Sequence, residues 1–177
     1  DGTTPIVAGT PITAAQAATL VFTPTANFNG TVTVPFTVTD NHGSISTSAN
    51  EVITVTPVID LPTAIPSTSS GAEDAPTISV DLTGTDPDGT VDFVTITTLP
   101  LVSEGVLFLA DGTTPVLAGT PVTAAQAATL VFPPAVNFNG TVTIPFIVTD
   151  NDGNVSAAAA NEVITVTPVI DLPTATP

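Results

Sequence analysis

Hydrophobic and polar residues alternate along several short stretches of the chain. In "TVTVPFTVT", residues 31–39, Val or Phe occupies every second position, and Thr or Pro occupies the positions between. A period of two predicts a β-strand with one buried face and one face covered by threonine. Pro35 lies on the outward face, which favours an edge strand or a bulge over a central strand.

Nearly the same segment occurs twice. "NFNGTVTVPFTVTDNHG" spans residues 27–43, and "NFNGTVTIPFIVTDNDG" spans residues 137–153. The flanking segments repeat too, with one extra residue in the second copy of the loop that follows. A fixed period of this length indicates a tandem repeat of one structural unit.

The repeat divides the chain into one complete unit and parts of two others. "VIDLPTA" contains Pro62 and lacks alternation, so we interpret it as a linker. One complete repeat then covers residues 62–172, after the C-terminal half of another at residues 1–61 and before the start of the next at residues 173–177. Because half a unit cannot close a core, we expect the natural chain to continue on both sides.

The pattern predicts an all-β fold, an antiparallel β-sandwich. "TAAQAAT" allows about one helical turn, capped by Thr13 or Thr123. The expected strands of the complete unit are Thr77–Leu82, Val91–Thr97, Gly105–Leu109, Ala128–Phe132, Gly140–Asp150 and Val163–Thr167. Asn29-Gly30 and Asn139-Gly140 are expected in tight turns. The expected aromatic core is Phe93, Phe108, Phe132, Phe138 and Phe146.

Charge excludes several functions. The 177 residues contain 16 Asp and Glu, one His, and no Lys or Arg, for a net charge of −16. Electrostatic binding to nucleic acid or to an anionic membrane surface needs cationic side chains. With no internal cation to pair with, clustered carboxylates are expected to bind counter-ions. Hydrophobic residues make up 42%, too many for a disordered chain.

Two loops concentrate carboxylates. "TDPDGTVD" places Asp86, Asp88 and Asp92 within seven residues, and three such groups repel one another unless they are protonated or bridged by a cation. Oxygen ligands in a short turn with Gly suit Ca²⁺. "TDNDG", with Asp150 and Asp152, is a second candidate. Its other copy has His42 in place of Asp152, which favours an Asx-type turn over a metal site.

Several motifs together resemble a known family. "GAEDAPTISVDLTGTDPDGTVDFVTITTLP", "GVLFLADGTTP", "LVFPPAVNFNGTVTIPFIVTDNDG" and "NEVITVTPVID" resemble the cadherin-like, Ig-like tandem repeats of giant bacterial surface adhesins exported by type I (RTX-type) systems. The resemblance implies a calcium-rigidified stalk with a cation near each junction between repeats. Glu73, Asp74 and linker Asp60 would then approach the loop of Asp86 and Asp88, and Asp171 would serve the next junction.

An enzyme is not expected. The chain lacks Cys, Lys, Arg, Trp and Tyr, and its one His has no nucleophile or carboxylate arrangement around it. A carboxylate pair of the glycosidase type stays formally possible. A carbohydrate-binding module is an alternative, although sugar sites usually need aromatic platforms and the eight Phe mostly occupy core positions.

The expected function is that of a structural extender, or stalk repeat, of a cell-surface adhesin or extracellular fibre on the bacterial surface. Its partners would be neighbouring repeats of the same chain. A second structural alternative is a fibre subunit, completed by strands from a neighbouring chain. No nucleic acid and no direct membrane binding are expected.

Overall fold

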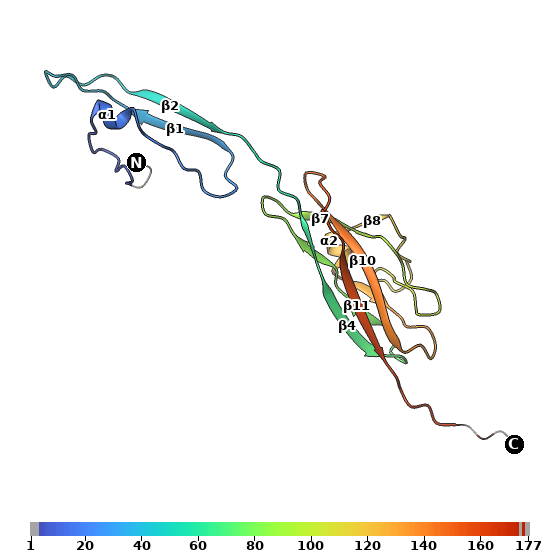
Figure 1. Cartoon of the computed structure of the whole chain (residues 1–177). Helices are drawn as coiled ribbons and strands as arrows, with labels where there is room; N and C mark the ends of the chain where they lie inside the picture. Colours follow the sequence, from blue (N-terminus) through green and yellow to red (C-terminus); the bar gives the residue numbers. More distant parts are fainter. Residues whose placement is uncertain (1–3, 174, 176–177) are drawn as a thin grey trace. The chain divides into compact units, whose positions relative to one another are not determined.

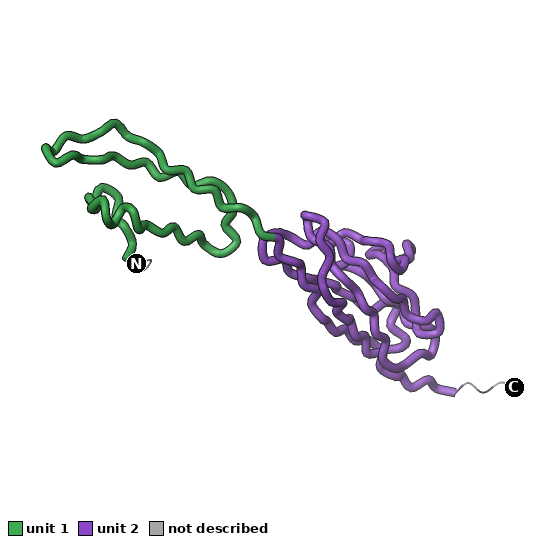
Figure 2. The backbone as a smooth tube through the Cα atoms, turned by 45° about the horizontal axis from the view of Figure 1, so that its top comes forward, with its two compact units in different colours: residues 1–58 green, residues 59–177 purple. Residues whose placement is uncertain are grey.

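The computed structural model describes residues 4–173 and 175. The chain divides into two compact units, Asp1–Val58 and Ile59–Pro177, called unit 1 and unit 2 below (Figure 2). Each unit is described by itself.

Unit 2 is an all-β sandwich, as the alternation predicts. Its largest sheet has five strands in the order β4-β11-β10-β7-β8, and β3-β6 and β5-β9 form two smaller pairs (Figure 1). Among the described strand pairs, β4–β11 alone is parallel. The elements are β3 (Thr63–Ile65), β4 (Ser67–Ala72), β5 (Ile78–Val80), β6 (Thr83–Thr85), β7 (Val91–Ile96), β8 (Pro121–Thr123), α2 (Ala124–Ala127), β9 (Leu130–Phe132), β10 (Gly140–Asp150) and β11 (Ala160–Thr167).

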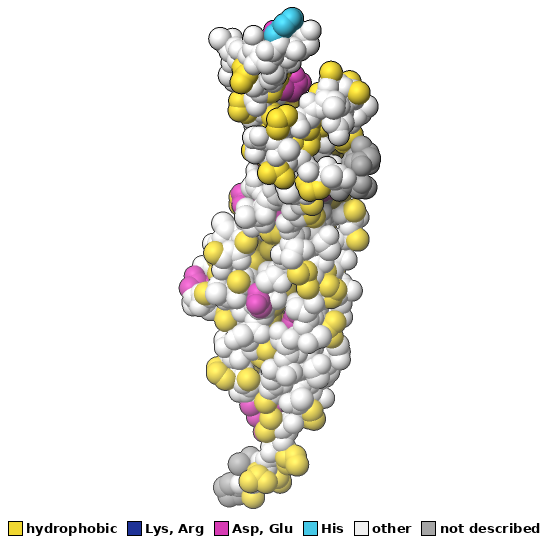
Figure 3. Space-filling view, turned by 90° about the vertical axis from the view of Figure 1, so that its left-hand side faces the viewer, with side chains coloured by type: hydrophobic (Ala, Val, Ile, Leu, Met, Phe, Trp, Pro, Cys, Tyr) yellow, Lys and Arg dark blue, Asp and Glu magenta, His cyan; other side chains and the backbone are white. Residues whose placement is uncertain are grey.

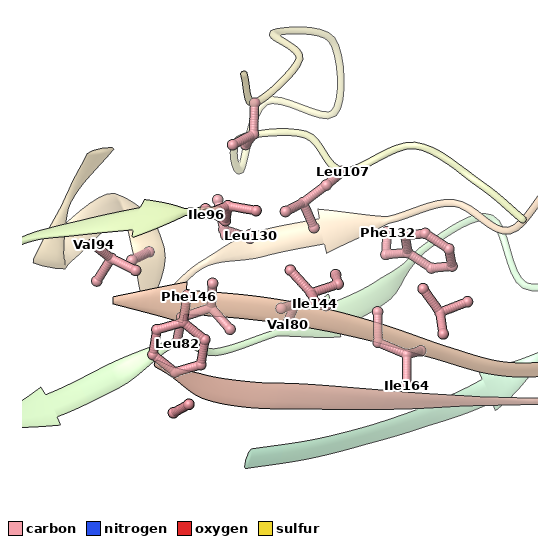
Figure 4. Close-up of a cluster of buried hydrophobic side chains, with 14 of the residues drawn as sticks. Val80, Leu82, Val94, Ile96, Leu107, Leu130, Phe132, Ile144, Phe146 and Ile164 are labelled. Atoms are coloured by element: carbon pink, nitrogen blue, oxygen red, sulfur yellow. The ribbon is translucent and has the colours of Figure 1, made fainter. Parts of the chain in front are cut away.

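The core lies between the inward faces of these sheets. Phe132, Ile144 and Phe146 are fully buried, and they pack in one cluster with side chains from β5 and β7 (Figure 4). Every second residue of β10 from Val142 to Asp150 is buried, so the threonines lie on the other face. The period of two therefore fixes which face of β10 meets the core.

Part of the predicted aromatic core is wrong. Phe93 is 40% exposed, whereas Val94 and Ile96 on the same strand are buried. The pairing with β10 shifts in register between Thr149 and Asp150, which leaves Asp92 as an extra residue on β7. Such a β-bulge reverses the inward and outward alternation, so Phe93 points outward. Phe108 and Phe138 are partly buried.

Sequence patterns also missed several strands. β3 lies where the Pro-containing linker was expected to end, and β4 is the polar segment "STSSGA". β4 has no hydrophobic alternation, but its backbone pairs with β11 from Glu162 to Thr167. The expected strand Gly105–Leu109 forms only isolated bridges, with Pro134, Pro115 and Val131.

Unit 1 reproduces the short helix and the hairpin of the second half of unit 2, but its described residues form no equivalent of β8 or β9. It contains α1 (Ala14–Ala17), β1 (Gly30–Phe36) and β2 (Ala49–Val55). The β1–β2 register, from Gly30 opposite Val55 to Phe36 opposite Ala49, matches the β10–β11 register residue for residue.

The two helical turns also match. In both copies the threonine hydroxyl accepts a hydrogen bond from the backbone of a glutamine three residues on, and that glutamine side chain accepts one from the threonine backbone. This reciprocal capping box satisfies the free amides at the start of a helix. The predicted caps, Thr13 and Thr123, are confirmed.

The turns before β1 and β10 differ in detail from the expectation. The positive φ angles needed there belong to Asn27 (61°) and Asn137 (57°), together with Gly30 and Gly140. Asn tolerates this left-handed conformation better than most residues.

Replacing Phe146 by Ala tests the core. Because Phe146 is fully buried, the variant is expected to lower the free energy of unfolding of unit 2 by about 3–5 kcal/mol. The matched change Phe36→Ala, at the equivalent position in unit 1, should leave the unfolding of unit 2 unchanged. Urea denaturation followed on NMR signals of unit 2 measures both, and a cost below about 1 kcal/mol for Phe146→Ala would contradict the packing described here.

Candidate cation site

The loop between β6 and β7 holds a carboxylate with no partner. Both oxygens of Asp86 are buried, and neither accepts a hydrogen bond from any described residue. Buried polar atoms are nearly always hydrogen-bonded, because leaving one unpaired costs its full desolvation energy. Asp86 therefore needs either a proton or a cation.

The electrostatics of Asp86 point the same way. Burial raises the pKa of Asp86, and the nearby charges of Asp88 and Asp150 raise it further. The backbone amide of Asp88 opposes this shift without completing a hydrogen bond. With no Lys or Arg anywhere in the chain, no side chain can neutralise the group.

A second oxygen lies beside Asp86. Asn151, in the turn after β10, accepts a hydrogen bond from the backbone N–H of Thr90 at 2.7 Å through its side-chain oxygen. A Cβ on Gly89 would lie 2.2 Å from that oxygen and 2.5 Å from Oδ2 of Asp86. Gly89 therefore lets both oxygens close over the backbone of the loop, which no other residue would permit.

A pocket opens next to this loop. It has a volume of about 360 Å³ and is lined by residues that include Thr85, Asp86, Gly89 and Thr90. The pocket gives an ion or water access to the loop that carries the unpaired carboxylate.

The linker reaches the same loop. The backbone N–H of Asp60 donates to Oδ2 of Asp88 across 3.5 Å, at the long limit for such a contact. Asp60 and the loop of Asp86 and Asp88 are thus brought together, as the resemblance implied.

Asp150 forms an Asx-type turn. Its Oδ1 accepts hydrogen bonds from the backbone amides of Asp152 (2.9 Å) and Asn154 (2.7 Å), and its Oδ2 accepts from the Asn154 side chain. Burial alone would raise the pKa of Asp150, but these hydrogen bonds outweigh it and lower the pKa. Asp40 in unit 1 makes the same turn with His42 and Ser44, so the turn interpretation is confirmed.

Glu73 lies at the other end of unit 2. Its carboxylate accepts hydrogen bonds from the backbone N–H of Val169 (2.8 Å) and from the side chain of Asn139 (3.0 Å). Asn139 directly precedes β10, whereas Asp150, which acts on Asp86, ends it. An 11-residue strand is roughly 30 Å long, so the expected convergence of Glu73 with Asp86 in this unit is wrong.

The remaining candidates lie at the surface of unit 2. Asp74, Asp92 and Asp152 have exposed side chains. Within residues 4–173 and 175, no three His, Asp or Glu side chains form a group that could hold a metal ion. On the face drawn in Figure 3, acidic side chains occur at separate places rather than in one patch. The ligand assignment as a whole stays a prediction.

Sequence reasoning missed the amide partners of these acids. Asn151 and Asn139 each stand beside a motif residue already singled out, and a search for amide oxygens and donors near the carboxylates would have found them. It also missed Glu162, a fully buried acid on β11 that accepts a hydrogen bond from the hydroxyl of Ser69. The alternation of "NEVITV" puts Glu162 on the same face as Ile164, which was the available signal.

Comparison with known proteins supports a structural repeat. A family model described as a cadherin-like domain matches residues 4–56. Since this segment recurs in the second half of unit 2, the match supports a cadherin-like structural repeat. No curated protein matches the chain.

One solved structure, of the fibronectin(III)-like modules of Clostridium thermocellum CbhA, is 18% identical with a TM-score of 0.30. The alignment covers 79% of this chain and 64% of that one. No helix among the described residues is long and apolar enough to cross a membrane.

The role of Glu73 can be tested by acid titration. The hydrogen bond from Val169, and then that from Asn139, lower the pKa of Glu73 from 4.5. Because the pKa of Glu73 is lower in the folded state than in the unfolded state, its ionised carboxylate stabilises the fold at pH values above the unfolded-state pKa. This stabilisation is lost as the pH falls through the folded-state pKa. Glu73→Gln should therefore flatten the loss of unit 2 stability below about pH 4.5.

Urea unfolding at a series of pH values measures this slope. Asn139→Ala, which removes one of the two donors, should give an intermediate slope. An unchanged slope in Glu73→Gln would show that the carboxylate does not stabilise this end of the sandwich.

Proposed function

We propose that the repeat is an extender of a stalk, in a cell-surface adhesin or an extracellular fibre, and that Ca²⁺ bound at the loop of Asp86 and Asp88 stiffens its linker. The observation that carries the proposal is the buried, unpartnered carboxylate of Asp86 in a chain without cationic side chains. The tandem repeat and the cadherin-like match of residues 4–56 support the structural role.

The residues present fit a hard cation. Asp86 offers two oxygens without competing hydrogen bonds, and the side chains of Asp88 and Asn151 add oxygens from the same region. Ca²⁺ takes six to eight oxygen ligands in a flexible arrangement. The described carboxylates cannot complete that number alone, so water or backbone carbonyls would supply the rest.

Stiffening follows from the position of the loop. Asp88 already contacts the backbone of linker residue Asp60. A cation shared by Asp86 and Asp88 would remove the repulsion between these carboxylates and hold the loop in one conformation. The linker segment that contacts the loop would then lose much of its freedom to hinge.

The natural setting follows from the same role. As a stalk element, the repeat would act outside the cell, on the bacterial surface, with neighbouring repeats of its own chain as its partners. In this setting the high negative charge would keep the protein soluble and would reduce non-specific association. No catalytic residue is assigned.

Calcium titration of the whole chain tests the proposal. Calcium should raise the melting temperature of unit 2, and a site that binds only the folded state stabilises it by about 2.7 kcal/mol at 100 times the dissociation constant. Small-angle scattering should show a narrower distribution of molecular dimensions with calcium than with chelator.

Variants make the test specific to the loop. Asp86→Asn should melt higher than the wild type in chelator at pH 7, because it removes a buried charge, and it should lose most of the calcium response. Asp81→Asn removes one exposed carboxylate between β5 and β6 and should keep the full response. If chelator changes neither melting nor dimensions, or if Asp86→Asn responds like the wild type, calcium does not act through this loop.

A further inference from the structure

Equivalent hydrophobic residues differ sharply in exposure between the two units. Val34, Phe36 and Val38 on and after β1 are 44%, 46% and 61% exposed, whereas their counterparts on β10 are fully buried. Leu20 and Phe22 are also exposed, although Leu130 and Phe132 are buried. The hairpin register is the same and the sequences nearly so, so unit 1 presents an apolar sheet face, called the β1–β2 face below, that lacks the cover present in unit 2 among its described residues.

Unit 2 shows what covers this face. Core residues from the first half of the repeat pack in one cluster with those of β10 and β11, among them Val80, Leu82 and, from the neighbouring strand β7, Val94 and Ile96 (Figure 4). All of these belong to residues 62–110. Unit 1 has no such segment among its described residues, and residues 20–22 form no strand there, because the β5 partner of β9 has no equivalent.

The hairpin edges are open in the same way. In unit 2, β4 pairs in parallel with the free edge of β11, and β7 pairs antiparallel with the free edge of β10. Within unit 1, β1 and β2 pair only with each other. The β1–β2 face therefore offers two strand edges as well as an apolar surface, and each edge has a defined partner strand and direction.

One polar residue adds specificity to this surface. Glu51 of β2 is exposed, and its counterpart Glu162 is fully buried and accepts a hydrogen bond from the hydroxyl of Ser69 on β4. Covering the β1–β2 face would bury Glu51. A buried carboxylate without a donor is costly, so the cover must bring a hydroxyl or similar group to this position.

We infer that the β1–β2 face is a docking surface for one kind of segment, the first half of a repeat with the strand pattern of residues 62–110. This inference does not depend on the proposed calcium site. The docked segment would place one strand in parallel beside β2, with its serine at Glu51, and one strand antiparallel beside β1.

A second intact copy is a poorer occupant. Residues 62–110 of that copy already lie in its own core, and releasing them would expose the buried residues of its β10. Two β1–β2 faces packed on each other would instead bury two Glu51 carboxylates with no cation or serine donor to meet them. The cost of burying unpaired charges argues against such a dimer.

The experiment supplies the segment in the same chain. Residues 62–110 are fused ahead of residue 1, which reproduces the natural junction between residues 110 and 111. Hydrogen exchange is then followed on the amides of β1 and β2 in the fused and unfused chains. In the fused chain their exchange should slow by about 100-fold or more and approach the rates of β10 and β11.

Two matched variants of the fused chain test the contacts. Phe36→Ser should return β1 and β2 to fast exchange, whereas Thr33→Ser, on the outward face, should leave them protected. The added segment contains a second copy of Ser69. Replacing that copy by Ala should lower the protection of the β2 amides from hydrogen exchange, while the protection of unit 2 stays unchanged. This last readout separates the Glu51 contact from general hydrophobic cover.

Other outcomes overturn the inference. If β1 and β2 exchange as fast in the fused chain as in the unfused one, the face does not accept this segment. If the unfused chain already sediments as a dimer with protected β1 and β2 amides, a second copy is the occupant instead.

Discussion

The structure of the repeat depends on one constraint, the burial of the apolar face of a hairpin by the first half of the same unit. Phe146 of β10 is fully buried, and the equivalent Phe36, which has no counterpart of that half among the described residues of unit 1, is 46% exposed. Both hairpins nevertheless have the same register, and both short helices have the same caps. Local hydrogen bonds therefore set the hairpin, while burial of the apolar face between the two halves completes the sandwich.

The absence of Lys and Arg imposes a second constraint, because buried carboxylates must be stabilised by neutral donors, by a proton or by a bound cation. Asp150 is held by the backbone and side chain of Asn154, and Glu73 by Val169 and Asn139. Hydrogen bonds to the ionised form lower the pKa of each. Asp86 has no comparable donor, and its pKa is raised. Glu162 also has one buried oxygen without a partner, but its other oxygen accepts a hydrogen bond from Ser69, whereas both oxygens of Asp86 are unpaired. This contrast, rather than the number of acidic residues, singles out the loop of Asp86.

Alternation predicted the strands that have one buried face. Residues 140–150 were expected as a strand and form β10 with those bounds. β4 gave no signal, since its small polar residues contribute backbone pairing rather than apolar cover. Phe93 was placed inward because a period of two cannot reveal the bulge at Asp92, which depends on pairing with β10. The local pattern thus identifies strands with one buried face. A β-bulge or a polar edge strand can be predicted only when the strand that pairs with it is known.

The candidate site was harder to predict, because spacing in the sequence does not tell which end of a sandwich a residue reaches. Asp60 and Glu73 are 13 positions apart, but β3 and β4 lie between them and carry the chain from one end to the other. The strands β5 and β6 then carry the chain back in the opposite direction, so that Asp86 lies at the same end of the sandwich as Asp60. Unit 2 therefore has acidic groups at both ends, separated by the length of β10. One cation cannot bind both groups within a unit, so the hydrogen-bonded end at Glu73 and the unsatisfied end at Asp86 must be stabilised by different chemistry.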